Sequence, residues 1–185
     1  MKRIIGGMMA VILAFSLVAC DKSEDSKNSS KANTDSSLAQ VEGLLSDGTY
    51  TSEFGYTVKL PVGWSKVTTA SAKEAFTDKL GNSSLSFHSG PTDDLFKAAD
   101  EEYFKKDYFA RMGDSVEFVS YDEIELNGNK GHKVVFTSKS DGVVTYLTQL
   151  LISVGEEIYI FTFTDVEGES QETIDAVITS LAING

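Results

Sequence analysis

Few side chains in this 185-residue chain have the chemistry of a reactive site, and the single cysteine, Cys20, is the most versatile of them. One thiol allows no intramolecular disulfide and no thiolate zinc cage, which needs several sulfurs. The two histidines, His88 and His132, stand far apart in the sequence, so we expect no multi-histidine metal site. The chain has 16 Lys and Arg against 28 Asp and Glu, and this net charge of −12 argues against nucleic-acid binding through a basic face.

The first twenty residues have the order of a secretory signal peptide. Lys2 and Arg3 form a short positive start, residues 4–18 are apolar apart from two glycines and a serine, and charge begins abruptly at Asp21. A transmembrane anchor is the alternative. As a helix, the sixteen residues 4–19 would span only ~24 Å, which is shorter than the ~30 Å hydrocarbon core of a bilayer.

The motif Leu17-Val18-Ala19-Cys20 at the end of this segment resembles the lipobox of bacterial lipoproteins. The resemblance implies that the Cys20 sulfur forms a diacylglyceryl thioether, that a peptidase cuts between Ala19 and Cys20, and that an N-acyl lipid can follow. Two acyl chains supply the double signal that stable membrane attachment requires. We therefore expect a signal peptide over 1–19 and a lipid anchor on the extracytoplasmic face of a bacterial cell membrane. A free thiol in an ordinary signal segment is the alternative.

The segment after the cysteine is predicted to be a disordered tether. Residues 21–37 contain four acids and three lysines, with no aromatic, proline or β-branched aliphatic residue. Such a segment cannot bury enough apolar surface to offset its ordering entropy. We assign residues 20–37 to the lipidated cysteine and the tether, and residues 38–185 to a single folded domain.

The first half of this domain predicts strands followed by one long helix. Residues 56–60 alternate as a half-buried strand, a turn follows at Pro61-Val62-Gly63-Trp64, and residues 75–79 and 84–88 form a weaker hairpin. Thr92 or Asp93 caps an internal helix with an apolar stripe that ends before Gly113. Glu102 and Lys106 are expected to pair at its edge. The stripe comprises Leu95, Phe96, Ala99, Tyr103, Phe109 and Ala110.

The second half predicts an antiparallel meander and a closing helix. Four strands, over residues 116–126, 132–139, 143–154 and 158–164, are separated by Asn127-Gly128, Asp141-Gly142 and a third turn. Both faces of the last strand are apolar, so it is expected to be central and covered on both sides. Ile174, Val177, Ile178 and Leu181 then form an amphipathic helix. The predicted class is α+β, an α/β/α sandwich with the meander sheet covered by the long internal helix and the C-terminal helix.

This order of elements resembles the PsbP-like family. The residues that carry the resemblance are Phe54 to Trp64, the strand that ends Ile124-Glu125-Leu126-Asn127-Gly128, and Tyr159-Ile160-Phe161-Thr162-Phe163. The family includes lumenal photosystem accessory proteins and uncharacterised bacterial lipoproteins, with docking and assembly roles and no shared catalytic set. The resemblance implies the fold and an accessory role. It transfers no functional residue to this chain.

No motif predicts catalysis. Gly113-Asp114-Ser115 resembles a lipase nucleophile block, but no histidine follows His132 to act as its base. Asp165, Glu167 and Glu169 lack the spacing of a calcium-binding loop. They are expected in a solvated turn before the last helix, because the helix dipole favours negative charge near its N-terminus. Both histidines are expected at the surface, and Trp64 in the core.

The aromatic residues of the internal helix suggest a docking surface. Phe104 and Tyr108 lie off its core stripe, so they are candidates for an exposed patch that binds a partner. The sequence thus predicts a lipid-anchored, noncatalytic module, with no cofactor and no metal, that docks an envelope protein or a small ligand. The alternative is a carboxylate- or metal-dependent enzyme of a type that the motifs do not identify.

Overall fold

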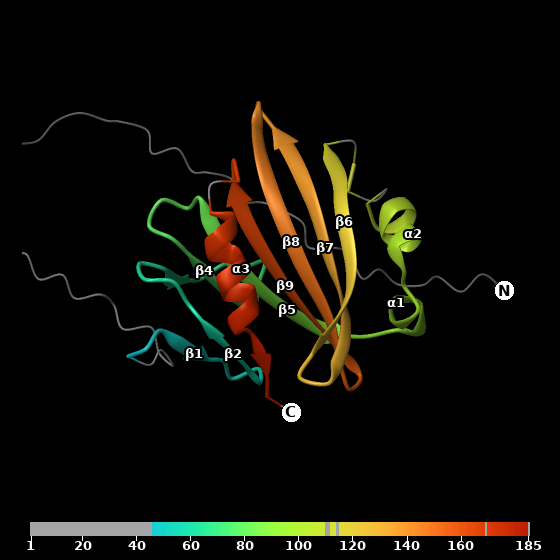
Figure 1. Ribbon diagram of the computed structural model, residues 1–185, viewed down its shortest axis with the longest axis horizontal. Coiled ribbons are helices and arrows are strands. Elements are labelled where there is room, and N and C mark those ends of the chain that lie inside the picture. Colours follow the sequence, from blue (N-terminus) through green and yellow to red (C-terminus); the bar gives the residue numbers. More distant parts are fainter. Residues whose placement is uncertain (1–45, 110–111, 114, 169, 185) are drawn as a thin grey trace, which may run out of the picture. The chain divides into compact units, whose positions relative to one another are not determined.

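The computed structural model describes residues 46–109, 112–113, 115–168 and 170–184, and of Leu95 only the backbone. The predicted signal peptide, lipobox and tether lie outside these residues. The main sheet has seven antiparallel strands in the order β3-β4-β5-β9-β8-β7-β6 (Figure 1). Their bounds are β3 (Ser65–Val67), β4 (Glu74–Thr77), β5 (Ser83–Pro91), β6 (Val116–Leu126), β7 (Asn129–Ser140), β8 (Val143–Val154) and β9 (Glu157–Val166).

The predicted meander is confirmed. β6, β7, β8 and β9 follow one another as neighbours, and β9 lies between β8 and β5 in the middle of the sheet. The turns at Asn127-Gly128 and Asp141-Gly142 have positive φ at both residues, 50° and 81° in the first and 51° and 84° in the second. This backbone matches the twist of the flanking strands, and it explains why the two dipeptides predicted the hairpins correctly.

A second, three-stranded sheet joins the two ends of the domain. β2 (Tyr56–Lys59) lies between β1 (Thr49–Thr51) and β10 (Ala182–Ile183) and is antiparallel to both. The small sheet and helix α3 (Gln171–Ser180) pack on one face of the main sheet around a core that includes Tyr56, Phe87, Phe161 and Ile174. Trp64 is buried in this core, as the sequence predicted.

The opposite face of the main sheet is covered by short helices. These are α1 (Asp94–Lys97), α2 (Glu101–Tyr103) and a π-helical turn η1 (Phe104–Tyr108). Phe104 of η1, Ala99 between α1 and α2, and Phe109 directly after η1 belong to a second core. Figure 1 shows α1 and α2 beside β6, whereas α3 packs against β2 and β9. β9 is therefore covered on both faces, with Phe161 and Phe163 in one core and Ile158 in the other.

The prediction of one long internal helix was wrong. α1 ends at Lys97, and the Asp100 side chain accepts a hydrogen bond from the backbone N–H of Tyr103, as Asp93 does from Phe96. Each carboxylate is an N-cap and starts a new helix, so Asp100 divides the predicted stripe. The predicted pair of Lys106 with Glu102 is present.

Candidate functional site

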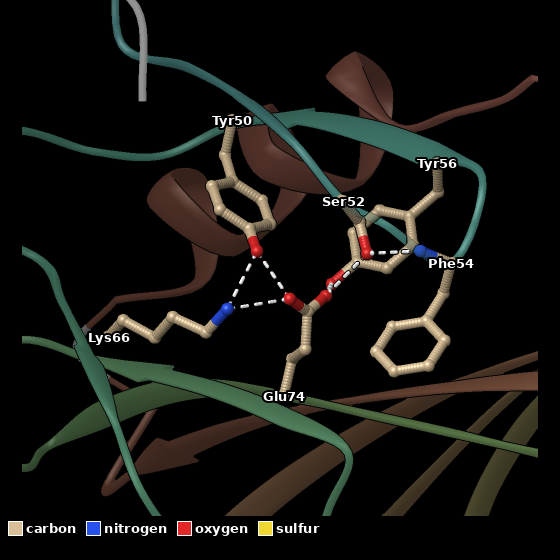
Figure 2. A network of polar contacts seen from close by, with 6 residues as sticks. All are labelled: Tyr50, Ser52, Phe54, Tyr56, Lys66 and Glu74. Carbon is tan, nitrogen blue, oxygen red and sulfur yellow. Dashed lines mark hydrogen bonds and ion pairs between the residues drawn. The ribbon is translucent and has the colours of Figure 1, made fainter. Parts of the chain in front are cut away.

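The most concentrated polar cluster of the described residues surrounds a buried carboxylate, Glu74, the first residue of β4. Its side chain is almost fully enclosed, and four protein groups donate to it (Figure 2). Ser52 Oγ and Tyr56 Oη each lie 2.6 Å from Oε2, and Lys66 Nζ lies 2.7 Å from Oε1. Tyr50 donates its hydroxyl to Oε1 as well. We call these five residues the Glu74 network.

Local structure explains why these donors converge. Tyr50 in β1 and Ser52 just after it are two residues apart, so both side chains point to the same face of the small sheet. Tyr56 comes from the adjacent strand β2, and Lys66 from β3, the neighbour of β4. The Lys66 ammonium also lies 2.8 Å from Tyr50 Oη and over the Tyr50 ring, 5.1 Å from its centroid.

Electrostatics keep Glu74 ionised. Burial pushes the pKa of its carboxyl up, but the hydrogen bonds from Lys66, Ser52 and the two tyrosines outweigh burial and hold that pKa below its usual range. Burial lowers the pKa of Lys66, yet its bonds to Glu74 and Tyr50 leave the pKa raised. Burial, together with the bond to Glu74, raises the pKa of Tyr56 far above its usual value, so this hydroxyl remains a donor.

The network has the chemistry of a structural crosslink. An ionised carboxylate offers about four acceptor sites, and here two donors occupy each oxygen. No lone pair is left to take a proton from a substrate or to bind a cation. The Glu74 network therefore fastens the small sheet to the β3–β4 edge of the main sheet.

Sequence reasoning missed Glu74, because the predicted hairpin strand began one residue later, at Ala75. The sequence did contain a signal for a buried carboxylate. Glu74 immediately precedes the apolar pair Ala75-Phe76 in a strand, and a carboxylate in such a place needs buried partners. The alternation of Tyr50 and Ser52 supplied candidates, but the pairing of β1 and β2 with distant β4 is a tertiary property.

A second polar cluster lies beneath α1 and η1 around His132. This β7 residue is largely buried, against the expectation of a surface histidine, and its Nδ1 lies 2.9 Å from Tyr121 Oη. The centroid of its ring lies 5.3 Å from the ring centroid of Phe96 and 5.4 Å from that of Phe104. Burial lowers the pKa of His132, partly opposed by a hydrogen bond with the Phe96 backbone and by Glu123. The pKa of the half-buried His88 is also lowered by burial and, to a lesser extent, by Lys73.

These pKa shifts predict loss of stability in mild acid. A histidine whose folded pKa is depressed costs the fold nothing above its ordinary pKa of 6.5. The cost grows as the pH falls below 6.5, because the unfolded chain then binds protons that the folded chain resists. Urea unfolding at a series of pH values should show the free energy of unfolding falling below pH 6.5. The fall should be smaller in the His132→Phe variant and in the His88→Gln variant. An unchanged pH dependence in both variants would contradict this assignment.

The predicted docking residues do not form an exposed patch. Phe104 is fully buried among Tyr103, Tyr108, Tyr121 and His132, and the prediction that it is exposed was wrong. The π-helical turn places it against the face of the sheet. Tyr108 is half-buried and donates to Gln149 Oε1 at 2.8 Å, and Gln149 in turn donates to Thr162 Oγ1 at 3.1 Å.

The acidic turn before α3 also differs from its prediction. Asp165 is buried, and its carboxylate accepts hydrogen bonds from the Ser170 backbone N–H at 3.0 Å and from Gln171 Nε2 at 2.7 Å. This carboxylate therefore holds the start of α3. Glu167 adopts a positive φ of 61°, and Glu169 lies outside the described residues. Within the part of the chain that the structure describes, no three His, Cys, Asp or Glu side chains are grouped so as to hold a metal ion.

The predicted lipid attachment site, Cys20, and the cleavage site between Ala19 and Cys20 lie outside the described residues. No helix among the described residues combines the length and the apolar character needed to cross a bilayer.

Comparison with known proteins shows which solved structures have a similar fold. No family model matches the chain, and no curated protein matches it by sequence. The cyanobacterial PsbP protein CyanoP of Synechocystis sp. PCC 6803 is similar in structure, with a TM-score of 0.58 and 16% identity, over 79% of this chain and 98% of CyanoP. The Saccharomyces cerevisiae Ran-binding protein Mog1p has a TM-score of 0.50 and 8% identity, over 70% of this chain and 90% of Mog1p. The likeness to CyanoP supports the predicted PsbP-like fold and its mostly antiparallel sheet, whereas the predicted long internal helix is replaced by short helices.

Proposed function

We propose that this protein is an exported lipoprotein, held at the extracytoplasmic face of a bacterial membrane by lipid on Cys20, whose domain is a noncatalytic docking module. The observation that carries the proposal is the position of the only cysteine, directly after Leu17-Val18-Ala19 at the end of the apolar segment. After cleavage before Cys20, the segment 21–37 would separate the lipid from the domain.

Two observations support a docking role over an enzymatic one. The most concentrated polar cluster of the described residues, the Glu74 network, has its acceptor sites filled by protein donors. The fold is shared with Mog1p, which is described as a Ran-binding protein. The same fold therefore serves protein binding elsewhere, although fold alone does not specify function. For this chain we propose an envelope protein or a small ligand as the partner.

The proposed lipid anchor is tested by replacing Cys20, the residue that accepts the lipid. In bacteria fed an alkyne-tagged fatty acid, the wild-type chain should incorporate the tag and sediment with membranes. The Cys20→Ser variant should lose both properties, because a serine hydroxyl does not replace the thiol in thioether formation. As a matched control, Ser30→Cys in the Cys20→Ser background restores a thiol at the wrong place and should remain unlabelled. Incorporation of the tag into Cys20→Ser would refute the proposal.

A further inference from the structure

Two fully or mostly exposed aliphatic side chains stand on neighbouring turns. The Val62 side chain is fully exposed in the β2–β3 turn, and the Leu80 side chain is 80% exposed in the β4–β5 turn. The turns lie at the same end of the β3–β4 pair, because Ser65 pairs with Thr77 and each turn adjoins one of these residues. We call Val62 and Leu80 the aliphatic tips. Single exposed aliphatic residues are ordinary, but two on adjacent turns form a candidate contact.

Both turns are built to hold their shape. The Asp78 carboxylate accepts hydrogen bonds from four successive backbone N–H groups, those of Leu80, Gly81, Asn82 and Ser83. In the other turn the Trp64 N–H donates to the Pro61 carbonyl at 3.1 Å, and Gly63 takes a φ of 93°. Each aliphatic tip is therefore presented to solvent by a fixed backbone, so little further ordering would be needed on contact.

The chain also enters the domain at this end. Thr49 pairs with Lys59, and the Leu60 N–H donates to the Gly48 carbonyl at 2.9 Å. The described chain thus begins beside Leu60, two residues before Val62. A lipid on Cys20 would tie the domain to the membrane through the segment that arrives here, and such a tether raises the effective concentration of nearby groups at the lipid surface.

We propose that the aliphatic tips Val62 and Leu80 contact the lipid surface and orient the domain with these two turns toward the membrane. This inference rests on the proposed lipid anchor. The ligand is the interfacial layer of a bilayer, which takes up aliphatic side chains that rigid turns project into it.

The test uses the full lipidated chain, purified and reconstituted in vesicles of phosphatidylcholine and phosphatidylglycerol in equal parts. Val62→Cys and Leu80→Cys each supply one thiol for an environment-sensitive fluorophore, because the thioether blocks Cys20. Val119→Cys is the matched control, an aliphatic residue that is 52% exposed on β6, at the opposite edge of the main sheet. Fluorophores at positions 62 and 80 should shift to the blue and be quenched by doxyl-labelled lipid, while the fluorophore at 119 should do neither.

The outcomes separate this proposal from the one it rests on. If the chain floats with vesicles but positions 62 and 80 behave like 119, the orientation is overturned and the anchor stands. A blue shift in native membranes that is absent in pure lipid vesicles would assign the aliphatic tips to a protein partner, and it too overturns the lipid contact. If wild-type Cys20 reacts with maleimide and the chain does not float, the anchor fails, and the orientation fails with it.

Discussion

Replacing Glu74 by alanine is expected to lower the free energy of unfolding by about 3–5 kcal/mol, because several buried donors lose their acceptor at roughly 1–3 kcal/mol for each unsatisfied group. The change leaves Lys66 and three hydroxyl donors without their acceptor, and Tyr56 is fully enclosed. Unfolding in urea can be followed through Trp64, the only tryptophan, which is buried in the same core as Tyr50 and Tyr56.

Two variants separate loss of the network from loss of a negative charge. Glu53→Ala removes an exposed carboxylate from the β1–β2 turn and should change stability by no more than about 0.5 kcal/mol. Glu74→Gln keeps one oxygen acceptor but turns a second group into a donor that faces other donors, so it should still destabilise the fold. A Glu74→Ala variant as stable as Glu53→Ala would show that the network contributes nothing.

Replacing Phe104 by alanine is expected to cost about 3–5 kcal/mol, as for other buried phenylalanines. The ring is completely enclosed, and its loss would leave a cavity between η1 and the sheet, next to Tyr121 and His132. Urea unfolding measures the effect. Leu80→Ala, on an exposed turn, is the control and should be nearly neutral. If Phe104→Ala left the free energy of unfolding unchanged, Phe104 would have to be exposed, and the packing described above would be contradicted.

The sequence predicted the sheet well because its signals are local. Asn127-Gly128 and Asp141-Gly142 specify their own backbone, and the apolar runs of β8 and β9 mark strands that are covered on both faces. The internal helix was mispredicted because a stripe of apolar residues looks the same whether one helix or three short segments present it. The capping carboxylate Asp100 was the local signal of the break.

The polar clusters were harder to predict, because their members meet only in the folded protein. Glu74 lies 24 residues from Tyr50 and 18 from Tyr56 in the sequence, and no periodicity links them. His132 was expected at the surface because its strand alternates. Its burial depends on α1 and η1, which pack over β7. Asp165 was assigned to the solvated turn, although it belongs to β9 and its buried carboxylate accepts hydrogen bonds from Ser170 and Gln171 at the start of α3.

The small sheet has a consequence for the order in which the chain folds. β2 completes its pairing only with β10, at residues 182–183, and the ties around that strand are also late: Ile183 donates to Asn127 Oδ1 at 2.9 Å and Asn184 to the Gly55 carbonyl at 2.8 Å. Contacts over such sequence separations form slowly, since a long loop must close first. A chain made from its amino end cannot close this sheet until residues 182–183 have been made. The domain therefore stays incomplete until that point, a state that would suit the export proposed above.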